Sequence, residues 1–133
     1  MAAHDDSGHE SVATLLALQR QWHTALARRL EEYVDAVPPD RAADAVRAAF
    51  KDTVREHLAV RLVLDEFAGH PALALPRRWE YTMIADAAGL TPAFNRGRDA
   101  ASAGASLVAD LHPDPDEHQR GGREHEGEQP GAL

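Results

Sequence analysis

Two histidines, His23 and His57, occupy the positions in this chain that best suit chemistry inside a folded core. Each stands among apolar residues at a spacing of three and four, and so interrupts an apolar helix face. Gln19 lies one turn before His23, and Thr53 and Arg61 lie one turn on either side of His57. An imidazole exchanges a proton near neutral pH, and a guanidinium can anchor an anion. These five residues form the candidate ligand-binding set.

The other six histidines have less support as functional groups. His70 is next to Gly69 and Pro71, where capping a helix end is its simplest role. The remaining five lie in or beside polar terminal segments, where nothing fixes the geometry that a metal site requires. They are His4, His9, His112, His118 and His125.

A long helical hairpin has to bring the candidate residues together. Apolar residues recur at helical spacing over residues 7–37 and again over residues 40–68. Pro38 and Pro39 lie between these segments, and neither can donate the amide hydrogen bond that a continuing helix needs. We therefore expect the chain to reverse at the prolines, with the two helices antiparallel.

In such a hairpin, residues whose numbers sum to about 77 lie at the same height. His23 then faces the level of Val54, and His57 faces the level of Arg20. The candidate residues on the two helices would share one layer, with Arg61 just beyond it. Because buried polar groups must find partners, this layer is either a ligand cavity or a closed hydrogen-bond network.

The ligand version of this layer is a site for a small anion or polar metabolite, with Arg61 as the charged anchor. A metal version would use His23 and His57, and it would need carboxylates from Glu80 or Asp86. The structural version has the two histidines bonded to each other, to Gln19 and to backbone carbonyls. The sequence predicts no cofactor, since it contains no phosphate-binding or dinucleotide-binding motif.

Local signals place the ends of the helices. Ser7–Glu10 has the form of a capping box, and Asp40 can cap the second helix, which we expect to end before Gly69. A third helix is predicted over residues 77–88, ending at Gly89 with Leu90 in contact behind it. Thr91–Pro92 is typical of the start of a fourth helix, which would reach about residue 111. One face of that helix has small residues that allow a close backbone approach: Gly97, Ala101, Gly104, Ala105 and Val108.

The predicted fold is all-α, a four-helix bundle built on a long antiparallel helical hairpin with two shorter helices. Residues 1–7 form a flexible N-terminus, residues 8–112 the helical domain, and residues 113–133 a disordered acidic tail. The tail is rich in acids, glycine and proline, so it cannot bury enough apolar surface to offset the entropy of ordering. Aromatic residues are 5% of the chain, so the core must consist of alanine, leucine and valine.

Composition also excludes several classes of function. The formal charge of −8 argues against a broad nucleic-acid or anionic membrane surface. The chain has no cysteine, no visible signal peptide and no apolar run long enough to span a bilayer, which favours a cytoplasmic protein. The preference for arginine over lysine, together with abundant alanine, is typical of a GC-rich bacterial genome. No serine has a histidine partner at a suitable spacing, so the sequence favours a non-enzymatic protein.

The segment 77–98 resembles the first half of a helix-turn-helix, with Ile84, Ala85, Gly89 and Leu90 at the spacing of its tight corner. Its second half departs from that pattern, because Asn95 stands where an aliphatic core residue is normal. A DNA-binding regulator is therefore a second alternative to the main hypothesis.

The main hypothesis is a helical protein-interaction module that associates with itself. The third helix is too short to cover an arm of the hairpin, so part of an apolar face is left for a partner, and a homodimer hides it most simply. A ligand-binding or metal-binding bundle that uses His23, His57 and Arg61 is the first alternative.

Overall fold

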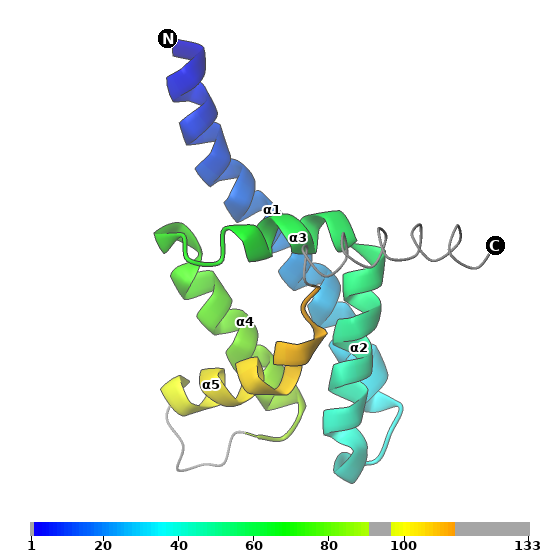
Figure 1. Cartoon of the computed structure of the whole chain (residues 1–133). Coiled ribbons are helices and arrows are strands. Elements are labelled where there is room, and N and C mark those ends of the chain that lie inside the picture. The colour runs from blue at the N-terminus through cyan, green and yellow to red at the C-terminus, as the bar shows by residue number, and fades with distance from the viewer. Residues whose placement is uncertain (1, 91–96, 114–133) are drawn as a thin grey trace, which may run out of the picture.

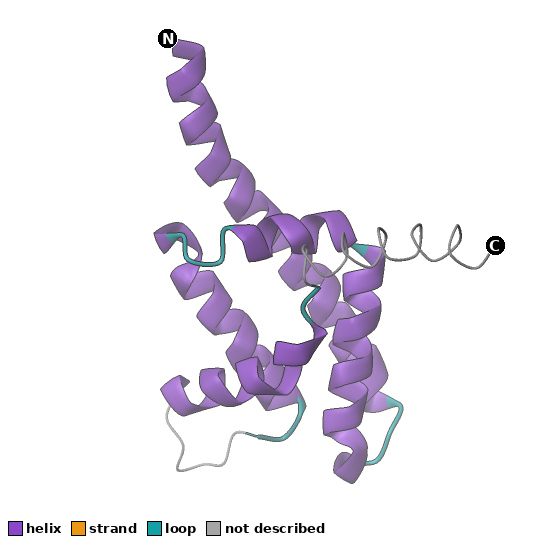
Figure 2. Ribbon diagram, viewed as in Figure 1, coloured by secondary structure: helices purple, strands orange, loops and turns teal. Residues whose placement is uncertain are grey.

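The computed structural model describes residues 2–90 and 97–113, with side-chain surroundings for residues 12–90 and 100–113. Within these ranges the chain is all-α, as the sequence predicts, and it contains no strand. The helices are α1 (Ala2–Asp35), α2 (Ala42–Glu56), α3 (Leu58–Glu66), α4 (Ala74–Ala87) and α5 (Gly97–Val108) (Figure 2). Short 3₁₀ turns precede α2 at Pro39–Arg41 and α4 at Pro71–Leu73, and another follows α5 at Ala109–Leu111. No helix in this part of the chain combines the length and apolarity needed to cross a bilayer. The predicted acidic tail and the predicted helix start at Thr91–Pro92 lie outside the described residues.

Helix α1 is the axis on which the other helices pack. Its buried stripe follows the helical period through Leu15, Trp22, Leu26 and Leu30, and α2 lies along it after the reversal at the twin prolines. The N-terminal turns of α1 project beyond the rest of the molecule (Figure 1). Because α1 already begins at Ala2, the predicted capping box at Ser7 lies inside the helix rather than at its start.

The second arm of the predicted hairpin is broken at His57. His57 leaves the helical conformation (φ −124°, ψ 44°) and serves as the C-cap of α2 and the N-cap of α3. Helix α3 then turns away from the direction of α2 and runs across α1 (Figure 1). The prediction of one continuous helix over residues 40–68 is therefore wrong, because the apolar surface of α3 is covered by crossing α1. Asp40 lies in the preceding 3₁₀ turn and does not cap α2.

Helices α4 and α5 complete the fold as a tightly crossed pair. Helix α4 ends in a Schellman motif: Gly89 has φ +75°, and the amide of Leu90 donates to the carbonyl of Ala85 over 2.8 Å. Gly104 of α5 is so close to α4 that a Cβ atom there would overlap the carbonyl group of Tyr81. This confirms that small residues in the fourth predicted helix permit a close backbone approach.

Candidate functional site

A buried cluster of polar side chains joins α1, α3 and α4, with Glu80 at its centre. Glu80 and Arg61 are each only 1% exposed. The Gln19 amide nitrogen donates to one Glu80 oxygen at 2.8 Å, and the Trp22 indole nitrogen donates to the other at 2.9 Å. The guanidinium of Arg61 lies over the Trp22 ring, 4.5 Å from its centroid, and forms an ion pair with Glu80 at 3.7 Å. The desolvation cost of burying the charges of Glu80 and Arg61 is therefore offset by their ion pair and by the hydrogen bonds to Glu80.

Asp65 and His112 extend this cluster toward the C-terminal end of the domain. Arg61 bonds through Nε to Asp65 at 2.9 Å, and the same carboxylate lies 2.9 Å from His112 Nδ1. His112 Nε2 is 3.4 Å from the Tyr81 hydroxyl, so the imidazole links α3 to α4. Arg61 and Asp65 thus hold the segment that follows α5 against the core. From the sequence, His112 lies beside the polar tail and has no assigned role, whereas the structure gives it fixed partners in Asp65 and Tyr81.

Two buried polar atoms of the cluster have no hydrogen-bond partner among the described residues. They are Oε1 of Gln19 and Nη1 of Arg61. The distance of 3.7 Å from Arg61 Nη1 to Glu80 gives an ion pair but exceeds hydrogen-bond length. The network around Glu80 is therefore not fully closed within the described residues, and it contains neither of the two histidines of the structural version considered from the sequence.

The five candidate residues are divided between the core and the surface. Gln19 and Arg61 meet at Glu80, whereas the Thr53 hydroxyl donates to the carbonyl of Ala49 within α2 at 2.7 Å. His23 and His57 are half-buried and line two different pockets. They do not line a common cavity: His57 borders the groove beside the end of α2, whereas His23 lies between α1 and the first turns of α4.

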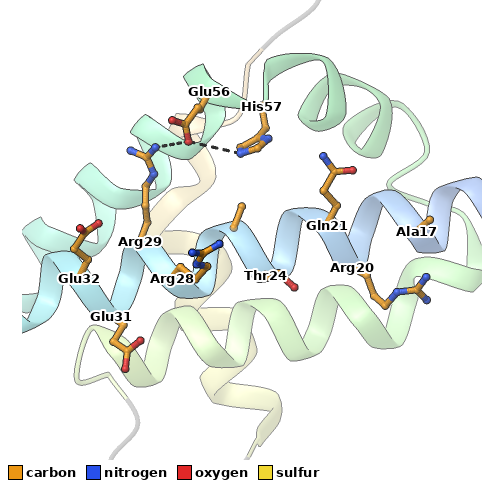
Figure 3. Close-up of a pocket in the computed structure, with 11 residues that line it drawn as sticks. Ala17, Arg20, Gln21, Thr24, Arg28, Arg29, Glu31, Glu32, Glu56 and His57 are labelled. Carbon is orange, nitrogen blue, oxygen red and sulfur yellow. Dashed lines mark hydrogen bonds and ion pairs between the residues drawn. The ribbon is translucent and has the colours of Figure 1, made fainter.

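The larger pocket is an open groove of about 1000 Å³ along the exposed side of α1, next to the end of α2. Its charged border includes Arg28, Arg29, Glu32, Glu56 and His57. Figure 3 shows Arg29 reaching across to Glu56, which also lies 3.6 Å from the imidazole of His57. The hydrogen bond to Glu56 raises the pKa of Arg29 above its ordinary value. This end of the groove is held by an ion-pair network between α1 and α2.

The smaller pocket, of about 310 Å³, lies between α1 and the first turns of α4. Leu16, Pro76 and Trp79 supply its apolar walls, and Gln19 and His23 supply polar groups. Trp79 is 60% exposed, and Leu75, one turn earlier on α4, is 53% exposed. A large aromatic side chain left in water beside an apolar hollow is typical of a binding surface.

A metal site has no support in the described part of the chain, where no three histidine, aspartate or glutamate side chains come together to hold an ion. Glu80, considered from the sequence as a metal ligand, instead accepts hydrogen bonds from Gln19 and Trp22. The guess that His23 and His57 ligate a metal gains nothing from the structure, since they line separate pockets.

The structure gives Arg77, in the segment 77–98 that resembles a helix-turn-helix, an internal role. Arg77 donates to the carbonyl of Ala68 at 2.7 Å and to the Tyr81 hydroxyl at 3.2 Å. It therefore caps the end of α3 instead of presenting its charge to a phosphate. Residues 91–96, which begin the second half of the predicted helix-turn-helix, lie outside the described residues, so this hypothesis stays a prediction.

Comparisons with known proteins add no family to this description: no family model, curated protein or solved structure gives a significant match. Function therefore has to be argued from the residues of this chain. The described part of the chain is a small all-α domain with a polar cluster in its core and two pockets beside α1.

Proposed function

We propose that this chain is a non-enzymatic helical interaction module that associates with itself. The observation that carries the proposal is the exposed side of α1, which has a groove on each flank and Trp79 beside it. Arg20 and Thr24 border both grooves, so the two hollows form one continuous surface. Tryptophan and arginine are among the side chains that are enriched where protein partners bind.

Light scattering coupled to size-exclusion chromatography tests this proposal on the full chain. We expect the mass to rise from that of one 14.5-kDa chain toward twice that value as the concentration increases. Trp79→Ala should weaken the association by about tenfold or more, because exposed tryptophans in interfaces contribute strongly to affinity. Ala48→Ser, on the exposed side of α2, is a matched surface control that should change nothing. A single-chain mass at every concentration up to several hundred micromolar would contradict the proposal.

A second candidate function is the binding of a small polar ligand in the smaller pocket. It is favoured by one observation: Gln19 lines this pocket, and its amide oxygen is buried without a partner among the described residues. The pocket volume of about 310 Å³ is at the lower end of the range for ligand sites. His23 and Arg20, which also line this pocket, would hold a carboxylate group of the ligand.

Thermal unfolding in the presence of small aromatic carboxylates tests this second candidate. If the ligand occupies the smaller pocket, an increase in melting temperature should be lost in His23→Ala and kept in His57→Ala. The two variants are matched, because each removes one half-buried imidazole, but from different pockets. The same shift in both variants would place the ligand elsewhere, and no shift with any compound would remove this candidate.

A further inference from the structure

The surface between the two grooves is an exposed helix face on α1. Arg20, Thr24 and Arg28 lie on it, and no hydrogen bond or ion pair connects their side chains to another residue in the described part of the chain. Thr24 and Ala25 are short side chains near its middle, which leave room for another helix to approach. This face therefore has the shape and the free polar groups that a partner helix needs.

Charge differs between the two ends of this face. Arg20 borders the end nearer the N-terminus, whereas Glu31 and Glu32 border the other end. Arg28 and Arg29 also lie at that second end, where Arg29 is paired with Glu56. Arg20 and Glu31 are eleven residues apart, which is about three turns and about 16 Å. They consequently project from the same side of α1, as Figure 3 shows. Both are exposed, so their charges are available to a partner.

A helix face with opposite charges at its two ends is complementary to itself in the antiparallel direction. A two-fold axis midway between Arg20 and Glu31 would bring Arg20 of each copy to Glu31 of the other, and Arg28 would fall near Thr24. A parallel arrangement would instead oppose like charges at both ends, which is unfavourable. The distribution of charge thus selects one partner, a second copy of this chain, and one direction.

We infer that two copies pair through antiparallel contact of their α1 helices, with reciprocal ion pairs between Arg20 and Glu31. This inference rests on the proposed self-association and specifies its surface. Trp79 lies along the flank of the same face and would be covered by the second copy. The ion pairs determine direction and register, while the apolar flank supplies most of the buried area.

Charge reversal in the full chain tests the inference. Arg20→Glu and Glu31→Arg should each weaken self-association by about tenfold or more, because each places like charges opposite one another. An equimolar mixture of the two variants should recover wild-type affinity. In the mixed dimer the introduced glutamate meets the introduced arginine, and the unchanged Glu31 of one variant meets the unchanged Arg20 of the other. Sedimentation velocity measures the strength of self-association for each variant alone and for their mixture.

Arg41→Glu is the matched control, because it makes the same charge change at an exposed position outside α1. It should associate like the wild type. Circular dichroism of each variant should show intact helices, as expected for substitutions at exposed positions.

The outcomes separate this inference from the proposed function. A wild-type chain that is monomeric throughout overturns both. A wild-type dimer that is unaffected by either reversal, or whose two variants do not recover affinity when mixed, overturns the α1 pairing and leaves self-association in place.

Discussion

Glu80 is the residue on which the buried polar cluster depends. It receives hydrogen bonds from two residues of α1 and an ion pair from α3, so it joins three helices at one carboxylate. A buried pair of this kind costs desolvation when it forms, yet removal of one partner leaves the other charge buried and uncompensated. This cluster therefore contributes more to fixing how the three helices pack than to the net free energy of unfolding.

Glu80→Gln should lower the free energy of unfolding by about 3 kcal/mol, because Arg61 would then face a neutral amide inside the core. Urea denaturation followed by circular dichroism measures the change. Glu66→Gln, the same substitution at an exposed position of α3, should stay within about 0.5 kcal/mol of the wild type. Equal stability of the two variants would show that Glu80 does not hold a buried charge pair.

Asp52 gives the domain a pH-dependent contribution at acidic pH. The hydrogen bond from the Tyr33 hydroxyl, followed by that from Arg55, holds the pKa of Asp52 below its usual value. Because the pKa is lowered in the folded state, Asp52 contributes stability above about pH 4, and this contribution is lost as the pH falls through the folded-state pKa.

Tyr33→Phe should raise the pKa of Asp52 toward its ordinary value, and the loss of stability below about pH 4 should become shallower. Titration of the Asp52 carboxyl carbon by NMR measures the shift. Asp110 provides a reference in the same spectrum, because its pKa is lowered by Arg47 and should not respond to the Tyr33 substitution. An unchanged Asp52 titration would contradict the assigned cause.

Part of this polar interior could be predicted from single residues. Gln19 and Arg61 stand at core positions of helical faces, and both are buried. Their shared partner Glu80 is 61 positions from Gln19, and the contact depends on how α4 is placed, which helical periodicity does not determine. His112 was missed for the same reason, since its partner Asp65 lies 47 positions away.

At the scale of elements, the crossing of α4 and α5 depends on the missing side chain of Gly104. Alanine normally stabilises a helix relative to glycine by about 1 kcal/mol. Here a Cβ atom would overlap a backbone carbonyl of α4, so the two helices would have to separate. Gly104→Ala should therefore destabilise the domain by about 1–3 kcal/mol, as overpacking does.

Thermal denaturation at a concentration where the chain is monomeric measures this effect. Gly69→Ala is the matched control, because no atom lies within 4 Å of the Cβ position and Gly69 has no positive φ. We expect the melting temperature of that variant to equal that of the wild type or to be slightly higher. A higher melting temperature for Gly104→Ala than for the wild type would mean that α4 and α5 are not in contact at this position.

The ends of the helices show which boundaries a sequence pattern can predict and which it cannot. Proline and glycine signals correctly place the reversal after α1 and the end of α4, since both act through the local backbone. The break at His57 has no such signal: residues 53–60 contain neither glycine nor proline. It becomes favourable only through packing, because it lets α3 cross α1 and bury Arg61 and Leu64.

For the whole molecule, the structure separates an interior that holds the helices together from a surface that is open to a partner. Glu80 and Arg61, at the centre of the polar cluster, are buried in the core, whereas the grooves beside α1 are reachable from solvent. The predicted all-α fold is confirmed, and the exposed surface was expected only as an uncovered apolar face. Its location on α1 could not be predicted, because it depends on how α3 and α4 are placed beside that helix.

Cysteine cross-linking is the most direct measurement of pairing through α1, since the natural chain has no cysteine. Thr24 lies near the midpoint between Arg20 and Glu31, so Thr24→Cys should bring two thiols close together in the proposed dimer. A short bis-maleimide should then convert most of this variant into a covalent dimer at micromolar concentration. Ala48→Cys, on the outer side of α2, should stay largely monomeric. Monomeric Thr24→Cys under these conditions, or more efficient linkage of the Ala48→Cys variant, would contradict the account.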